Sequence, residues 1–193
     1  ATPTATATPT ATPTPTATPT TPTTATISLA AGWNLIALPL QPAQPYTAES
    51  LLLEIAAQGG DALEVDRWFA GGWNSHPRGL PFNDFPVETG RGYFIKASRP
   101  SVWTLAGAPV TAPLTITFGT GWTLLAIPIP AIATARDLLL AIDAQGGNAL
   151  EVDRWYAGGW NAHVDGLPFN NFSLEPTRGY FVRTDRASTL VVQ

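Results

Sequence analysis

The sequence contains no cysteine and no methionine, and only 12% of its 193 residues are charged. Without cysteine the chain has neither disulfide bonds nor thiolate ligands for a metal ion. It holds a single lysine, Lys96, its arginines are scattered, and its formal net charge is −4. Nucleic acids and anionic membrane surfaces are bound by clustered cationic side chains, so neither is an expected partner. No stretch approaches the ~18 consecutive apolar residues of a membrane-spanning helix, so we expect no membrane insertion.

The first 25 residues consist only of alanine, threonine and proline. This composition buries too little apolar surface to fold alone, and its prolines favour an extended conformation. Such tracts are typical of O-glycosylated stalks and equally of plain interdomain spacers, so both interpretations stay open. Because the sequence opens inside this tract without an initiator methionine, we expect a processed or partial chain of a secreted protein. The candidate O-glycosylation sites are Thr2, Thr4, Thr6, Thr8, Thr10, Thr12, Thr14, Thr16, Thr18 and Thr20.

A long internal repeat organises the rest of the sequence. The segment QGGDALEVDRWFAGGWN…RGYF at residues 58–94 returns as QGGNALEVDRWYAGGWN…RGYF at residues 145–181. A repeat of this kind indicates two copies of one folding unit. The predicted divisions are an extended Thr/Pro tail (1–25), a β-rich module (26–107), a linker (108–113) and a second β-rich module (114–193).

Each module is predicted to contain about six short strands and one helix. The helix follows Thr47, a favourable N-cap, presents an apolar stripe, and stops at Gly59-Gly60. Its copy runs from Thr134 to Gln145. The predicted fold class is mostly β (α+β), with two tandem small antiparallel sheets or partly closed barrels, each carrying one short helix.

Two local patterns give finer predictions. The run at residues 32–40, GWNLIALPL, is apolar on both faces, which predicts a central, buried strand that Pro39 ends. The tetrapeptide Ala70-Gly71-Gly72-Trp73 predicts a hairpin in which the paired glycines supply the positive φ angles of a tight turn.

Glu64 and Asp66, repeated as Glu151 and Asp153, lie two residues apart on a predicted strand and so share a face. Such a pair could serve glycoside hydrolysis, but it is duplicated and nothing in the sequence indicates a raised pKa. A solvated strand face is therefore the preferred interpretation. Calcium, which takes hard oxygen ligands, is a weaker alternative. Its candidate ligands are Asp61, Glu64, Asp66, Asn83 and Asp84.

His76 and His163 are the only histidines, one in each module. They have no metal-binding spacing, so no metal or cofactor is assigned. Ser75 beside His76 becomes Ala162 beside His163, which argues against a serine nucleophile and leaves the chain without an assigned catalytic residue. We expect both histidines to be hydrogen-bonded to the backbone.

The chain is rich in tryptophan, with 7 residues. Two of them flank each hairpin turn, and these are Trp68, Trp73, Trp155 and Trp160. Flat, exposed tryptophans can form a platform on which sugar rings stack, whereas buried ones would fill a core or the seam between modules. Both interpretations stay open for the four flanking residues. Trp103 aligns with Leu190 and is expected to be a packing residue.

The Thr/Pro tract followed by tandem GWNLIALPL…EVDRWFAGGWN…RGYF modules resembles secreted, multi-domain surface proteins of bacteria. The resemblance covers the layout of the whole chain and implies no enzymatic activity. Our first hypothesis is a non-enzymatic, extracellular structural subunit of a surface fibre, filament or adhesive stalk. Copies of the chain would associate head to tail by strand pairing at residues 26–29 or 102–105. The alternative is a tandem carbohydrate-binding module whose partner is a polysaccharide.

Overall fold

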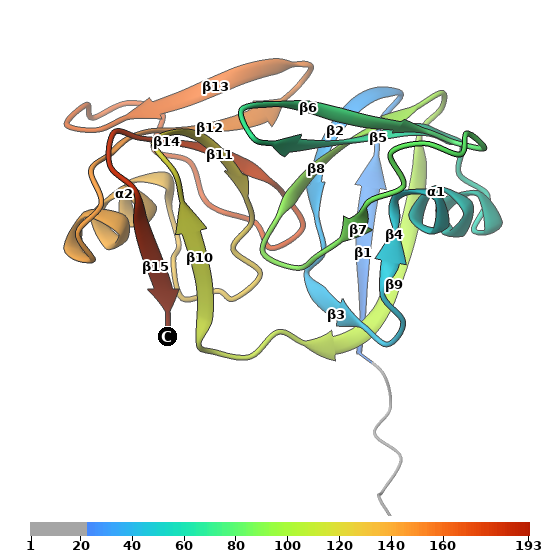
Figure 1. The fold of residues 1–193 in the computed structure, drawn as a ribbon, viewed down its shortest axis with the longest axis horizontal. Coiled ribbons are helices and arrows are strands. Elements are labelled where there is room, and N and C mark those ends of the chain that lie inside the picture. The colour runs from blue at the N-terminus through green and yellow to red at the C-terminus, as the bar shows by residue number, and fades with distance from the viewer. Residues whose placement is uncertain (1–22) are drawn as a thin grey trace, which may run out of the picture.

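The computed structural model describes residues 23–193 (Figure 1). The chain is mostly β, with several small antiparallel sheets and one helix in each repeat. None of the sheets in this part of the chain closes into a barrel, so of the two predicted forms the small antiparallel sheet is the one observed. The candidate glycosylation sites at residues 2–20 lie outside the described residues.

The first repeat contains β1 (Thr23–Leu29), β2 (Gly32–Ala37), β3 (Leu40–Pro42), β4 (Tyr46–Thr47), α1 (Ala48–Ala57), β5 (Ala62–Phe69), β6 (Gly72–Pro77), β7 (Pro86–Val87), β8 (Gly92–Ala97) and β9 (Ser101–Pro109). The second contains β10 (Leu114–Phe118), β11 (Gly121–Leu125), α2 (Ala135–Ala144), β12 (Ala149–Tyr156), β13 (Gly159–Val164), β14 (Tyr180–Thr184) and β15 (Ser188–Val192).

Two strands extend past the predicted module boundaries. β1 begins at Thr23, so the last three residues assigned to the tail belong to a strand. That strand pairs with β9 from Thr23 opposite Gly107 to Leu29 opposite Ser101. β9 itself continues to Pro109, inside the predicted linker, because its last residues pair with β3. The segments expected to pair between chains therefore pair with each other inside the first module.

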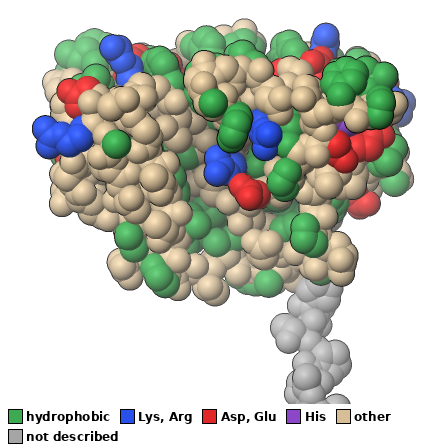
Figure 2. Space-filling model, viewed as in Figure 1, with side chains coloured by type: hydrophobic (Ala, Val, Ile, Leu, Met, Phe, Trp, Pro, Cys, Tyr) green, Lys and Arg blue, Asp and Glu red, His purple; other side chains and the backbone are tan. Residues whose placement is uncertain are grey.

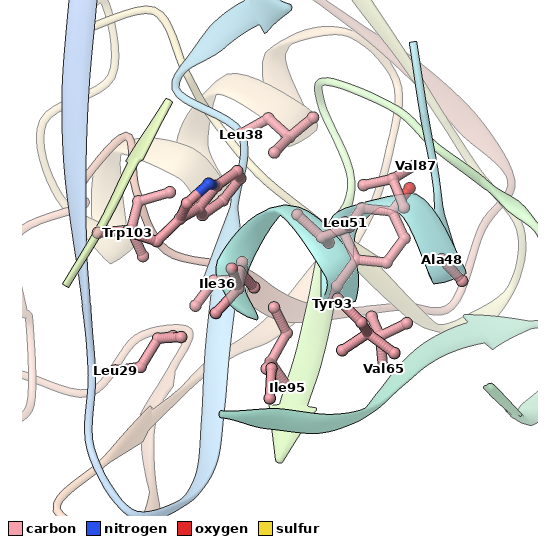
Figure 3. Packing of buried hydrophobic residues seen from close by; sticks show 14 of the residues in the cluster. Leu29, Ile36, Leu38, Ala48, Leu51, Val65, Val87, Tyr93, Ile95 and Trp103 are labelled. Carbon is pink, nitrogen blue, oxygen red and sulfur yellow. The ribbon is translucent and has the colours of Figure 1, made fainter. Parts of the chain in front are cut away.

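Each repeat is a layered unit built on a four-stranded antiparallel sheet. The strand order is β2-β8-β5-β6 in the first repeat and β11-β14-β12-β13 in the second. One face of each sheet packs against the helix and against a smaller sheet, β1-β9-β3 or β10-β15. Figure 3 shows this core in the first repeat, where Trp103 is fully buried, as expected of a packing residue, beside Leu38 and Ile36. The helices lie at the outer ends of the molecule and the hairpins β5-β6 and β12-β13 along one edge (Figure 1).

The helices begin where the sequence predicts. The Thr47 hydroxyl accepts a hydrogen bond from the Ser50 amide at 3.2 Å, and the Ser50 hydroxyl oxygen accepts one from the Thr47 amide at 2.8 Å. Thr134 and Asp137 make the same reciprocal cap on α2. These pairs satisfy amides that the first helical turn leaves without partners. The apolar stripe of α1 is buried in the core at Leu51, Leu52 and Ile55.

The prediction of a central strand at residues 32–40 is wrong in its position. The run divides into β2 and β3, and β2 lies at the edge of its sheet beside β8. Both of its faces are nevertheless covered, because Ile36 joins the core of its own module while Leu35 packs against the other module. Burial by a second module gives an edge strand the apolar pattern that normally marks a central one.

The hairpin turn lies where it was predicted, but the two residues with positive φ angles are not the predicted pair of glycines. The positive φ angles fall on Ala70 (51°) and Gly71 (79°), and in the second repeat on Ala157 (50°) and Gly158 (79°). Both central residues of this tight turn type need positive φ, so each repeat holds an alanine in the left-handed region.

Candidate ligand-binding site between the modules

The two four-stranded sheets face each other across the module interface. The sheet face opposite each core carries Leu35 and Phe94 in the first repeat, and Leu124 and Phe181 in the second. These four side chains form a buried apolar cluster, in which each phenylalanine is only 6% exposed. The interface therefore has a small core of its own, separate from the two module cores.

The contacts across this interface are reciprocal. The Trp68 indole N–H donates to the Trp122 carbonyl at 2.9 Å, and the equivalent Trp155 donates to the Trp33 carbonyl at 2.9 Å. Two backbone hydrogen bonds repeat the pattern, from the Ala37 amide to Thr177 at 2.9 Å and from the Ala126 amide to Gly90 at 3.0 Å. When equivalent residues exchange roles in this way, the two units are related by a local two-fold axis.

An aromatic hollow lies between the two hairpins, off this local axis. Trp73 of β6 and Trp160 of β13 each pack edge-on against both Phe94 and Phe181, with ring centroids 5.5–5.8 Å apart. Both indoles are half exposed, at 47% and 49%. Between them lies a hollow of about 240 Å³, which we call the indole slot. It is lined by Trp68, Trp73, Trp122, Asp153, Trp160 and Phe181.

The four predicted tryptophans divide between the two roles considered for them. Trp68 and Trp155 are partly buried against the interface cluster, whereas Trp73 and Trp160 project into solvent. Their planes cross at 75° in the first hairpin and 76° in the second, so they do not form the flat platform that the sequence suggested. They form walls instead, because cross-strand pairing places each indole edge against its neighbour's face.

Sequence reasoning missed the phenylalanines under the walls. Phe94 and Phe181 end the repeated RGYF motif, directly after Tyr93 and Tyr180, which point into the module cores. Two consecutive large aromatic residues on a strand must lie on opposite faces, and both can be buried only when both faces are covered. This signal was present in the sequence and indicates the interface.

The carboxylates near the slot also differ from expectation. Asp66 and Asp153 each have a buried Oδ1 atom without a hydrogen-bond partner. Burial, followed by the effect of the neighbouring Glu151 carboxyl, raises the pKa of Asp153 to about 6. Burial likewise raises the pKa of Asp66 to about 6. The interpretation as a fully solvated strand face is therefore wrong, because the opposing module removes water from that face.

The remaining acidic and amide residues have structural roles at separate places. Asp61 accepts hydrogen bonds from Arg78 and Ser98, and Asp84 accepts one from the Glu49 amide at the start of α1. Asn83 donates to the Ser75 carbonyl. Among residues 23–193 no three acidic or histidine side chains converge to hold a metal ion, and the five calcium candidates do not meet.

Both histidines are buried strand residues bonded to the backbone, as predicted. Nδ1 of His76 lies 2.8 Å from the Phe82 carbonyl, and Nδ1 of His163 lies 3.0 Å from that of Phe169. The sequence did not reveal the second partner of His76, the carboxylate of Glu49 at 2.8 Å from Nε2. Burial acts to lower the pKa of His76, but its hydrogen bonds to Glu49 and Phe82 outweigh burial and raise that pKa above 6.5.

Figure 2 shows hydrophobic side chains gathered along the edge of the molecule that the two hairpins form. In the described part of the chain neither helix has the length and apolar character needed to cross a membrane. Comparisons with protein-family models, curated proteins and solved structures gave no match. The case for a function therefore depends on the geometry of the indole slot and on the layout of the sequence.

Proposed function

We propose that the two repeats form one non-enzymatic binding unit of a secreted surface protein and that its ligand is a saccharide. The observation that carries the proposal is the pair Trp73 and Trp160, half exposed above the buried ring of Phe181. Large aromatic side chains left this exposed beside one another are a feature of binding sites. A sugar ring offers apolar C–H faces to aromatic walls and hydroxyl groups to a carboxylate, and the slot provides both.

The geometry of the carboxylates supports binding rather than hydrolysis. Asp153 is the only carboxyl group that lines the slot, and Glu151 does not line it. Glycosidases hold their two carboxyl groups roughly 5–9.5 Å apart, with the scissile bond between them. With a single carboxyl group at the slot there is no second one to act across a scissile bond, so we assign neither Glu151 nor Asp153 a catalytic role.

The extracellular setting is proposed from the sequence. The Thr/Pro tract is typical of linkers and stalks that connect domains outside the cell. A weakly charged surface without a cationic cluster fits a neutral or polyhydroxylated partner better than a nucleic acid. A binding module attached through this tract would hold its carrier protein on a polysaccharide surface.

The test is titration of the purified chain with a panel of neutral and amino-sugar oligosaccharides, followed by calorimetry and tryptophan fluorescence. We expect one ligand per chain, because a ligand in the slot occupies both Trp73 and Trp160, which a symmetry-equivalent slot would also need. Trp73→Ala and Trp160→Ala should each weaken binding about tenfold, since one aromatic contact is worth on the order of 1.5 kcal/mol. Tyr156→Ala is the matched control, because this aromatic residue is 57% exposed but does not line the slot.

Two results would refute the proposal. One is the absence of binding by every saccharide in the panel. The other is equal loss of affinity in Tyr156→Ala and in the slot variants, which would place the ligand elsewhere on the hairpin edge.

The fibre subunit is the second candidate, favoured by the position of β1. This strand pairs with β9 only, so one of its edges has no partner strand among residues 23–193. An edge strand of this kind can accept a strand from another copy of the chain. Negative-stain electron microscopy and intact mass test the idea together: we expect filaments and extra mass on the tail from a glycosylated structural polymer. Monodisperse particles at the bare chain mass of 20.4 kDa would contradict it.

A further inference from the structure

The residues that line the indole slot favour a positively charged ligand over a negatively charged one. Four of its six lining residues are tryptophans, one is Phe181, and the only ionisable group is Asp153. The face of an aromatic ring carries negative potential, so it attracts cations and gives anions nothing to bind. A slot with aromatic walls and one carboxylate is therefore complementary to a positive charge.

Asp153 also lacks the partners that a buried carboxylate normally has. Its Oδ1 atom is inaccessible to solvent and has no hydrogen-bond donor in the described chain. A buried acceptor without a donor is costly, and an ammonium group supplies three donors and no competing acceptor. An ammonium group in the slot would neutralise the carboxylate through the part of Asp153 that lines the slot, without contacting the buried Oδ1 atom.

The charged surroundings of Asp153 are few. Glu151 lies on the same strand, Arg183 of β14 is paired with Glu151, and Ala162 lies opposite Asp153 on β13. The groups that influence the pKa of Asp153 act only to raise it, whereas Lys96 acts to lower that of Asp66. Among residues 23–193 no ion pair joins Asp153 to an arginine, lysine or histidine side chain, so the carboxylate is open to a ligand cation.

We propose, building on the saccharide function above, that the ligand of the indole slot is an amino sugar with a free, protonated amino group. The ammonium lies against the faces of Trp73 and Trp160 with Asp153 as its counter-ion. The sugar ring fills the rest of the slot against Trp68, Trp122 and Phe181. N-acetylation removes the positive charge and so weakens binding.

The pH dependence has a defined sign. A bound cation favours the ionised form of Asp153, so protonation of this carboxyl competes with the ligand. Because the pKa of Asp153 is raised to about 6, loss of its charge should weaken binding about tenfold between pH 7 and pH 5, while fuller protonation of the amino group over the same range acts in the opposite direction. The affinity of Asp153→Asn should follow the amino group alone, and the parent chain should lose about tenfold relative to it. Asp165→Asn, which changes an exposed aspartate outside the slot, should behave as the parent chain.

The experiment is a titration with three matched oligosaccharide series: glucosamine, N-acetylglucosamine and glucose oligomers of equal length. We expect the glucosamine series to bind at least tenfold more tightly at pH 7, with the preference lost in Asp153→Asn. Equal affinity for all three series would overturn the charge proposal and leave the saccharide function standing. Binding of none of them would overturn both. Thermal melts of each variant show that it is folded, and removing a buried charge should not unfold the chain.

Discussion

Two glycines lie against each other where the modules meet, and filling the space between them should push the modules apart. Gly92 and Gly179 lie where β8 and β14 begin. A Cβ atom on Gly92 would lie 2.9 Å from the Gly179 Cα and 2.8 Å from a methyl carbon of Leu124. A Cβ on Gly179 would lie 2.8 Å from the Gly92 Cα. Both clashes include backbone atoms, which cannot be relieved by rotating a side chain.

The expected cost of Gly92→Ala follows from these distances. Ordinary contact begins near 3.4 Å, so the two strands must separate by about 0.5 Å. Overpacking of this kind costs about 1–3 kcal/mol. The same movement would lengthen the Trp68–Trp122 and Trp155–Trp33 hydrogen bonds, each 2.9 Å long, and each is worth about 1 kcal/mol. We expect the free energy of unfolding to fall by about 2 kcal/mol and the melting temperature by about 5 °C.

The assay is urea denaturation followed by tryptophan fluorescence, with Gly72→Ala as the control. A Cβ on Gly72 would meet nothing within 4 Å, so this variant should stay within about 0.5 kcal/mol of the parent chain. The double variant Gly92→Ala/Gly179→Ala should lose less than the sum of the two single losses, because either alanine already opens the same contact. If Gly92→Ala is as stable as Gly72→Ala, the modules do not pack as described.

Two further substitutions test the hairpin turn and the contact between His76 and Glu49. Ala70→Gly should raise the free energy of unfolding by about 0.5–1 kcal/mol in thermal melts, because Ala70 holds a φ of 51° that glycine adopts without strain; a loss of stability would contradict the assigned turn. Glu49→Gln should change how stability depends on pH. The raised pKa of His76 gives the parent chain stability that is fully present below about pH 6.5 and is lost as pH rises through the folded-state value, so the variant should lack this fall in urea denaturation series. An unchanged profile would show that the pair contributes nothing, and the second module, with Arg136 where the first has Glu49, offers no substitute.

Local structure was predictable wherever neighbouring residues determine it. The caps at Thr47 and Thr134 fix the helix starts through hydrogen bonds that span three residues. The hairpins follow from alternating strands around a glycine-containing turn. The positions of strands within the sheets were less predictable. A strand with two buried faces can be packed against elements of its own module or against another module, and the sequence pattern is the same in both cases. Residues 32–40 illustrate this, since the covering element of their outer face is the other module.

The candidate site was predictable in its residues but not in its shape. The tryptophans flanking the turns were identified from their repeated positions, and three of the four line the indole slot. The burial that raises the pKa of Asp153 depends on how one module sits on the other, which no short sequence window contains. The carboxyl pair looked solvated for the same reason, because the residues that remove its water come from a distant part of the chain.

The local two-fold axis changes what the duplication means. A repeat that folds as two independent modules would give two equivalent sites, whereas here each module supplies one wall of a single slot. A sugar has no two-fold symmetry, so it must distinguish the halves or bind in two orientations. Both halves keep a cation at the same strand position, Lys96 in the first and Arg183 in the second, whereas Ser75 opposite Asp66 is replaced by Ala162 opposite Asp153. Because Asp153 lines the slot and Asp66 does not, a positively charged ligand should orient its amino group toward Asp153.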